Sequence, residues 1–319
     1  MTSIRLPLVN AHPLWGVAQL LGVLLTLVLL SGLVLWPTAS LHLLWNMVIP
    51  ILPAVFLVNP MLWRNVCPLA TLNELGGRRR ESPTVKLGLL VTGWGIGIAL
   101  LLLMVPARHF LFNEHGTVLA WTISGVAVLA LASGFLASRR AGFCNTLCPV
   151  LPVEKLYGQS PLLQLGSARC SDCNRCTTVG CIDLAGRRSL AQSVSGTRGP
   201  AWLLSPVGIF VALFPGFIYG YFTTADGPLS TALATYGTVA LWSGVSLLVV
   251  FILVQITRPR AAVAHAVLGG LSLGIYYWFA APKLADAYGA SATIGAGLQV
   301  AMLTLVAVWM FRAIKREVG

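Results

Sequence analysis

Long apolar runs dominate the chain and constrain its fold more than any other feature. Stretches such as GVLLTLVLLSGLVLW and LGLLVTGWGIGIALLLLMV contain no charged residue. A helix of about 18 apolar residues is long enough to cross a bilayer, and it satisfies its own backbone hydrogen bonds there. The strands of a membrane barrel would instead alternate in polarity over about ten residues. The runs are continuous, so we expect an all-α polytopic membrane protein.

We expect about eight transmembrane helices, each at an apolar run long enough to span. They lie at residues 15–36, 41–62, 87–106, 117–137, 201–222, 230–255, 262–281 and 292–312. The composition agrees, because 9% of the residues are charged and a soluble domain has about 25%. Prolines interrupt the second span at Pro50 and Pro53 and the fifth at Pro206 and Pro215. The first run is too long for the core of a signal peptide, so no cleavage is expected.

The positive charges are distributed very unequally between the two sides of this topology. With eight spans both termini share one side, and 19 of the 21 lysines and arginines fall there. Arg108 and Lys283 alone fall on the other side. The positive-inside rule makes the basic side cytoplasmic. We therefore expect a multi-pass protein of the bacterial inner membrane with both termini in the cytoplasm. The net charge of +12 reflects this topology, and we expect a lipid bilayer and no nucleic acid as partner.

All seven cysteines fall in the two expected cytoplasmic loops, 63–86 and 138–200. They are Cys67, Cys144, Cys148, Cys170, Cys173, Cys176 and Cys181. The cytoplasm keeps thiols reduced, so disulfides explain these cysteines poorly. A cluster of thiols in a reducing compartment indicates metal binding instead.

The spacing of three of these cysteines favours iron and sulfur over zinc. Cys170, Cys173 and Cys176 form C-x2-C-x2-C, the ferredoxin spacing in which the fourth cysteine often ligates another cluster. Zinc sites usually pair two C-x2-C units across a longer stretch. Cys181 follows after four residues rather than three, and Ile182 stands where ferredoxins have proline. Whether Cys181 serves the same cluster therefore stays open.

An internal repeat relates two of the other cysteines. WRNVCPLATLNELGG at 63–77 aligns with CNTLCPVLPVEKLYG at 144–158, at a constant offset of 81 residues. Cys67-Pro68 then matches Cys148-Pro149, and each element follows a pair of expected spans. Proline ends a helix, so both elements are expected to turn the chain at the membrane surface. The first copy has Trp63 in the position of Cys144; chance similarity between two membrane-exit turns is the alternative.

These motifs resemble the polyferredoxin-like membrane iron–sulfur proteins. That family includes the membrane ferredoxins of periplasmic nitrate-reductase systems, the nitrous-oxide-reductase regulators and the cytochrome-oxidase accessory ferredoxins. The resemblance covers roughly residues 40–185, within which a cytoplasmic ferredoxin-like iron–sulfur loop is expected. It implies one or two [4Fe-4S] clusters. The family usually has two C-x3-C-P elements and two ferredoxin-type runs, whereas this chain has one complete element, one partial element and one run.

Two ligand schemes remain open for two clusters, because two cubanes need eight thiolates and seven cysteines exist. In the first scheme Cys148 completes the loop cluster, and Cys67, Cys144 and Cys181 hold a second cluster with Asp183 or a small molecule. In the second scheme Cys181 completes the loop cluster. Cys67, Cys144 and Cys148 then hold a three-iron or site-differentiated cluster. A single cluster with three unused thiols is the third possibility.

The expected organisation has three parts. Residues 1–137 carry the first four helices and the first Cys-Pro element, residues 138–200 form the cytoplasmic cysteine-rich segment, and residues 201–319 carry the last four helices. No catalytic triad, P-loop or dinucleotide fingerprint is present. We therefore expect an electron-transfer subunit of an oxidoreductase complex rather than a stand-alone enzyme. It would link other redox subunits or a soluble carrier at the cytoplasmic face to membrane quinone or a larger complex. The alternative is an assembly factor that supplies electrons for insertion of a metal centre.

Histidines give a weaker signal. His42, Trp45 and Asn46 share one face of the second expected span at i, i+3, i+4 spacing, which indicates either a packed polar cluster or a quinone contact. His109 and His115 flank Glu114 in a short outer loop. Both are expected to face water.

Overall fold

The computed structural model describes residues 13–77, 87–136, 143–163 and 199–318. Helices make up the regular structure of these ranges, and no β-strand lies in them. The expected all-α fold is confirmed. The cysteine-rich run Cys170, Cys173, Cys176 and Cys181 lies outside the described residues.

The helices follow one another along the chain with short connections. The first group is α1 (Pro13–Leu35), α2 (Pro37–Leu43), a π-helix η1 (Leu44–Val48), α3 (Ile49–Val58), α4 (Pro60–Val66), α5 (Pro68–Gly77), α6 (Leu87–Met104), η2 (Pro106–His109), α7 (Gly116–Leu136), α8 (Phe143–Thr146) and α9 (Leu151–Tyr157). The second group is η4 (Gly199–Leu204), α11 (Pro206–Thr223), η5 (Leu229–Thr231), α12 (Ala232–Thr257), α13 (Ala261–Ala287) and α14 (Ala292–Val318).

Seven helices among the described residues are long and apolar enough to cross a membrane. They are Gly16–Leu35, Pro37–Val58, Gly116–Leu136, Pro206–Thr223, Leu229–Thr257, Ala261–Ala287 and Ala292–Lys315. Each coincides with an expected span to within a few residues. The third expected span corresponds to α6, whose described apolar stretch is the shorter Trp94–His109. The chain is therefore a helical protein with multiple membrane-spanning segments.

The second span stays helical through its prolines by widening one turn. Pro50 lacks an N–H, and its ring would clash with the Asn46 carbonyl in a regular α-helix. The helix is a π-helix at this point, over Leu44–Val48, and the Ile49 N–H bonds to the Leu44 carbonyl five residues back. Such single π turns absorb local conflicts in the backbone. The span therefore runs from Pro37 to Val58 without interruption.

The chain divides into two compact units. The first unit contains Met1–Leu41, Ala54–Leu101 and Glu114–Ser189, and the second contains His42–Pro53, Leu102–Asn113 and Leu190–Gly319. The two Cys-Pro elements belong to the first unit, and the four long C-terminal helices belong to the second.

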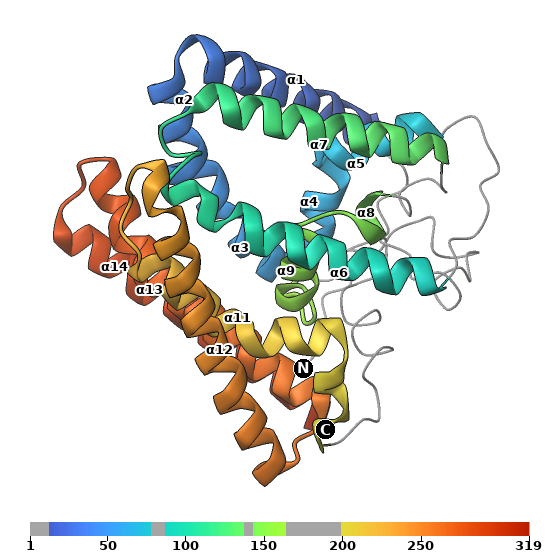
Figure 1. Cartoon of the computed structure of the whole chain (residues 1–319), viewed down its shortest axis with the longest axis vertical. Helices are drawn as coiled ribbons and strands as arrows, with labels where there is room; N and C mark the ends of the chain where they lie inside the picture. The colour runs from blue at the N-terminus through green and yellow to red at the C-terminus, as the bar shows by residue number, and fades with distance from the viewer. Residues whose placement is uncertain (1–12, 78–86, 137–142, 164–198, 319) are drawn as a thin grey trace. The chain divides into compact units, whose positions relative to one another are not determined.

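In the first unit α7 packs against α1 and α5 (Figure 1). Asn73 of α5 is fully buried, and its side-chain amide donates to the Ala130 carbonyl of α7 at 3.0 Å. Close approach is possible because Gly76 of α5 faces Gly134 of α7, where a Cβ atom would collide with backbone. α5 is thus fixed against α7 immediately after the first Cys-Pro element.

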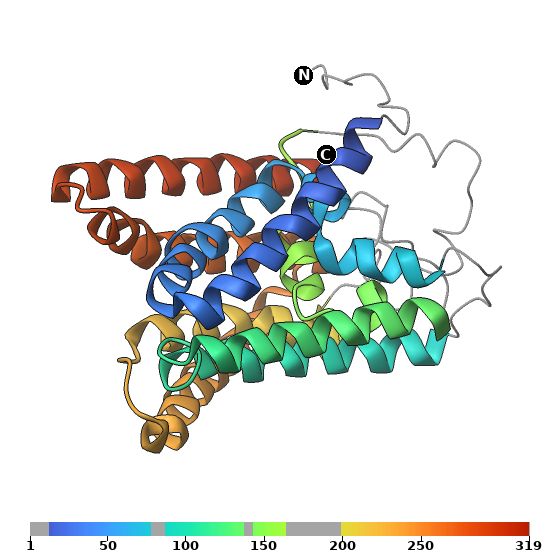
Figure 2. The same cartoon turned by 90° about the horizontal axis from the view of Figure 1, so that it is seen from above.

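In the second unit the helices pack as neighbouring pairs, α11 with α12 and α13 with α14 (Figures 1 and 2). Gly216 and Gly220 line the α11 face toward α12, and a Cβ atom at Gly216 would collide with the Trp242 carbonyl. Gly270 of α13 receives the side chain of Met310. Small residues at such spacing let membrane helices approach closely, because packing rather than water exclusion drives their association.

Candidate metal centre

The first Cys-Pro element is the junction of α4 and α5. The Cys67 N–H donates to the Trp63 carbonyl at 2.8 Å, and the Cys67 carbonyl accepts from the Thr71 N–H at 3.0 Å. The Thr71 hydroxyl donates to the same carbonyl at 3.1 Å. Pro68 takes the first position of α5, where a missing N–H costs nothing. Cys67 therefore has its backbone held on both sides.

The second Cys-Pro element also has backbone hydrogen bonds on both sides of its cysteine, but they reach five residues back and three residues on, where those of Cys67 reach four residues each way. The Cys148 N–H donates to the Phe143 carbonyl at 3.1 Å, and the Cys148 carbonyl accepts from the Leu151 N–H at 3.3 Å. α8 thus ends before Cys148, and α9 begins two residues after Pro149. Cys144 lies one turn earlier, inside α8. The two halves of the sequence repeat accordingly form two similar turns, each with a short helix on either side.

The two turns bring three thiols into one buried cluster, although Cys67 lies far from the other two along the chain. Ala70, Ala130, Phe143 and Cys144 form its buried core. The partly buried residues packed against this core are Cys67, Leu69, Val126, Leu147 and Cys148. No disulfide bond joins the three cysteines. Every described cysteine therefore belongs to the same cluster, with one thiol from the first repeat and two from the second.

Burial keeps the Cys148 thiol protonated. Its pKa rises to about 12, mainly because burial disfavours the thiolate and further because Cys67 lies close enough to repel it electrostatically. Backbone hydrogen bonds from Val150 and Leu151 act in the opposite direction. A thiolate is the form that ligates metal, so a cation at this site has to displace the proton.

A buried ion pair lies beside the cluster. Arg64 of α4 donates from Nε to Oε1 of Glu154 in α9, and both residues are almost fully buried. Burial raises the pKa of Glu154, and the Arg64 charge opposes that rise. The neighbouring Lys155 is also buried, with its ammonium 4.8 Å from the centre of the Trp94 ring. Arg64 and Glu154 lie in the two copies of the sequence repeat, and no motif indicates that they pair.

Three of the expected cysteine ligands, Cys67, Cys144 and Cys148, lie among the described residues. Within the described ranges, no three histidine, cysteine or acidic side chains are placed to hold one metal ion. An iron–sulfur cluster differs from a single ion, because each thiolate binds its own iron and the sulfur atoms need not meet at one point. Cys67, Cys144 and Cys148 supply the correct ligand type from an apolar site. The four remaining expected ligands lie outside the described residues.

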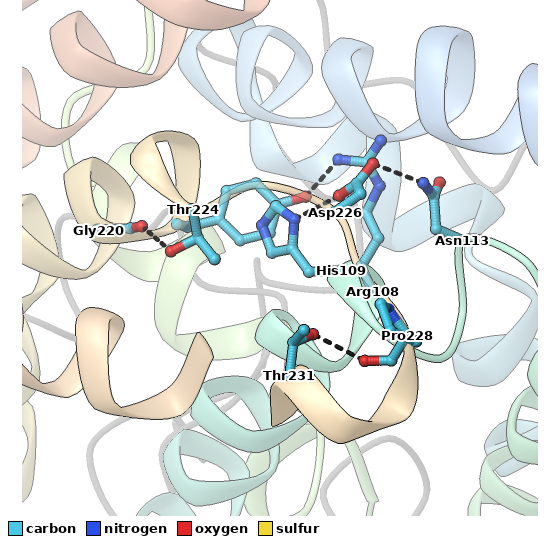
Figure 3. Close-up of polar contacts among 9 residues, drawn as sticks. Arg108, His109, Asn113, Gly220, Thr224, Asp226, Pro228 and Thr231 are labelled. Carbon is cyan, nitrogen blue, oxygen red and sulfur yellow. Dashed lines mark hydrogen bonds and ion pairs between the residues drawn. The ribbon is translucent and has the colours of Figure 1, made fainter. Parts of the chain in front are cut away.

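The second unit contains a polar cluster that the sequence did not reveal (Figure 3). His109 lies 2.5 Å from Asp226 through Nδ1 and Oδ1, and Asn113 donates to Oδ2 of the same carboxylate at 2.7 Å. Arg108 donates to the Tyr221 hydroxyl at 2.6 Å. The His109 bond lowers the pKa of Asp226. The expectation that His109 faces water is wrong: it is 5% exposed, because η2 packs beneath the loop that carries Asp226.

His42 and Trp45 contact different partners within the second unit. His42 lies 3.1 Å through Nε2 from the Ala287 carbonyl and packs edge-on against Tyr288. The Arg108 guanidinium lies over the Trp45 ring, with its Cζ atom 5.0 Å from the centre of that ring. The π-helix that starts at Leu44 changes the turn on which the expected common face depended. His42 is exposed and Trp45 is half-buried, and each contacts a partner of its own.

Comparisons of the chain with protein families, curated proteins and solved structures gave no match.

Proposed function

We propose that the chain is a membrane-bound iron–sulfur protein that carries electrons between a redox partner at the cytoplasmic face and membrane quinone or a larger redox complex. The observation that carries this proposal is the meeting of Cys67 with Cys144 and Cys148 in one buried cluster. These thiols come from separate repeats of a multi-span chain, and the ferredoxin-like spacing of Cys170, Cys173 and Cys176 follows directly in the sequence.

The packing of Cys67, Cys144 and Cys148 at one hydrophobic core supports one of the two ligand schemes for [4Fe-4S] groups. Since Cys67 and Cys148 both pack against the hydrophobic core that contains Cys144, we assign these three to one iron–sulfur group. Cys170, Cys173, Cys176 and Cys181 then hold the other, within the expected cytoplasmic loop. The scheme that joins Cys148 to the loop group would separate it from its two neighbours.

The residues around the thiols have a defined part in this function. When bound, an iron–sulfur group supplies one-electron oxidation and reduction. Phe143, Leu147 and Val126 place apolar surface beside the thiols and so limit the access of water to the ligands, which helps to set a reduction potential. Cys148 gives up its thiol proton on ligation. The chain contributes ligands, potential and position, and its partners contribute the donor and acceptor.

The proposed topology follows the charge distribution. α6 serves as the eighth span, both termini are cytoplasmic, and both Cys-Pro turns lie at the inner surface of a bacterial inner membrane. Nineteen of 21 lysines and arginines then lie on the inner side, as the positive-inside rule requires. The polar cluster around His109 and Asp226 lies on the outer side.

Metal analysis of anaerobically purified protein in detergent tests the proposal. We expect brown protein with about four iron and four sulfide ions per cubane, so that two groups raise the iron count to about seven or eight and the sulfide count to about eight. Colourless protein that contains zinc, or no metal, would contradict it and leave the three thiols as ordinary buried side chains. Stable co-purification with redox subunits separates an electron-transfer subunit from an assembly factor, which would associate only transiently.

A further inference from the structure

A row of contacts, called the seam below, joins residues 57–64, before the first Cys-Pro turn, to residues 154–163, after the second. The Leu162 N–H donates to the Leu57 carbonyl at 2.9 Å, and the Leu163 N–H donates to the Val58 carbonyl at 3.0 Å. The Asn59 side chain donates to the Leu163 carbonyl at 2.8 Å. These bonds fix the end of α3 and the residue that leads into α4 to the segment that follows α9.

The seam continues toward the cysteines. At Gly158 an added Cβ atom would lie 2.8 Å from the ring of Pro60, so the end of α9 touches the start of α4. One turn further along α4, Arg64 contacts Glu154 of α9. This ion pair is the seam contact nearest to the cysteines in sequence. Arg64 lies three residues before Cys67, and Glu154 lies six residues after Cys148.

Burial makes this pair a strong constraint on geometry. Arg64 and Glu154 are 3% and 4% exposed, so separating them would leave charges in an environment that solvates them poorly. Loss of one partner from a buried pair costs far more than the pair itself contributes. The arginine fork also orients its carboxylate more narrowly than a lysine would. α4 and α9, each carrying a cysteine turn at one end, are thereby held in one register.

We propose that the Arg64–Glu154 pair is a positioning contact that sets the separation of the Cys67 and Cys148 thiols before any metal arrives. The inference rests on the proposed function for its purpose, since it prepares a site for an iron–sulfur group. Its geometry belongs to the metal-free chain. Partners outside the ligand sphere commonly determine how well a metal site is held.

The first test is thiol cross-linking in the metal-free, full-length protein in detergent. Dibromobimane joins thiols that lie close together, and mass spectrometry of the digest identifies a Cys67–Cys148 product. We expect a clear yield of this product in the wild type at alkaline pH, where the Cys148 thiol ionises, and a several-fold loss in Arg64→Gln under the same conditions. The charge-swapped variant Arg64→Glu/Glu154→Arg should recover part of it. Equal yields in the wild type and Arg64→Gln would overturn the proposal.

Two further variants separate positioning from general damage. Lys155→Met removes a neighbouring buried charge whose ammonium lies over the Trp94 ring. It leaves the Arg64–Glu154 hydrogen bond in place, so it should leave the cross-link largely unchanged. Arg64→Gln/Glu154→Gln removes both charges and avoids leaving one unpaired, so it should remain monodisperse if Arg64→Gln aggregates. A several-fold loss of cross-link in this double variant supports the proposal, and a wild-type yield contradicts it.

The second test uses the protein as purified with its metal. We expect Arg64→Gln to lose iron to a chelator about tenfold more readily than the wild type, with Arg64→Lys intermediate. A wild type that cross-links in the expected manner but contains no iron would refute the proposed function and leave the positioning role standing. A wild type rich in iron whose Arg64→Gln variant matches it in cross-linking and iron retention would refute the positioning role alone.

Discussion

His109 holds the carboxylate of Asp226 at 2.5 Å through its Nδ1 atom, and the contact ties the loop after α11 to η2. The Gly227 N–H adds a second tie, since it donates to the His109 carbonyl at 3.0 Å. His109 is buried, whereas the Asp226 side chain is 48% exposed. Solvent therefore screens the carboxylate, and the pair contributes about 1 kcal/mol or less.

Asp226→Asn should remove this contribution in a pH-dependent manner. The pKa of Asp226 is lowered in the folded protein, chiefly by the His109 hydrogen bond. A lowered folded-state pKa stabilises the protein above the ordinary carboxyl pKa of about 4, and this stability is lost as the pH falls through the lowered value. Thermal unfolding in detergent should show the variant less stable than the wild type at pH 7. The difference should shrink toward zero in strong acid.

Thr231→Val provides the control for this experiment. Thr231 lies close to the same loop and donates its hydroxyl to the Pro228 carbonyl at 2.7 Å, but it has no charge to titrate. Its effect on unfolding should be the same across the acid range. If Asp226→Asn behaved in the same pH-independent way, the carboxylate would not be the stabilising form.

Gly216→Ala should weaken the packing of α11 on α12. A Cβ atom at Gly216 would collide with the Trp242 carbonyl and lie 2.6 Å from the Ser246 Cβ, and backbone cannot move aside at little cost. Overpacking of this kind destabilises by about 1–3 kcal/mol. Gly237→Ala on α12 is the matched control, because nothing lies within 4 Å of its added methyl group. Equal thermal stability of the two variants in detergent would contradict the close packing.

Much of the fold follows from the sequence because lipid leaves little choice. A run such as 262–281 is long and apolar, and in a bilayer its backbone can be satisfied only as a helix. α13 accordingly covers Ala261–Ala287. The sequence predicts the second span less firmly, since Pro50 and Pro53 would normally end a helix. The π turn over Leu44–Val48 is a local adjustment of the backbone, and no pattern of residues in the sequence predicts it.

The candidate site could be predicted only in part, for a similar reason. The repeat around Cys67 and Cys148 indicates two equivalent turns, because each copy is one contiguous segment and can be recognised by aligning the two segments. The Arg64–Glu154 and His109–Asp226 pairs join residues that lie 90 and 117 positions apart. Such pairs depend on how helices pack, and a single sequence does not encode packing in a readable pattern. The position of His109 in a short loop between two spans therefore predicts a solvent-exposed side chain, although the fold buries it.

Substitution of single cysteines should sort the ligands into two groups. Since Cys67, Cys144 and Cys148 share one cluster of side chains, Cys67→Ser, Cys144→Ser and Cys148→Ser should alter the same EPR signal of the reduced protein. Cys173→Ser should alter the other signal, because its loop holds the second group in the proposed scheme. Ser133→Ala on the exposed face of α7 is the control and should leave both signals intact. A Cys148→Ser spectrum that matches Cys173→Ser instead would favour the scheme with Cys148 in the loop group.

Alkylation of Cys148 in the metal-free protein should be slow at neutral pH and accelerate only in strong alkali. Burial and the neighbouring Cys67 raise the pKa of this thiol to about 12, and only the thiolate reacts. An ordinary cysteine, with a pKa of about 8.5, already reacts readily at pH 9. Iodoacetamide labelling from pH 7 to 11, followed by peptide mass spectrometry, measures this difference, and the protein unfolded in denaturant supplies the reference rate. Folded and unfolded Cys148 that label equally fast at pH 9 would show that the thiol is accessible and ionised, contrary to its packing against the hydrophobic core that contains Phe143 and Cys144.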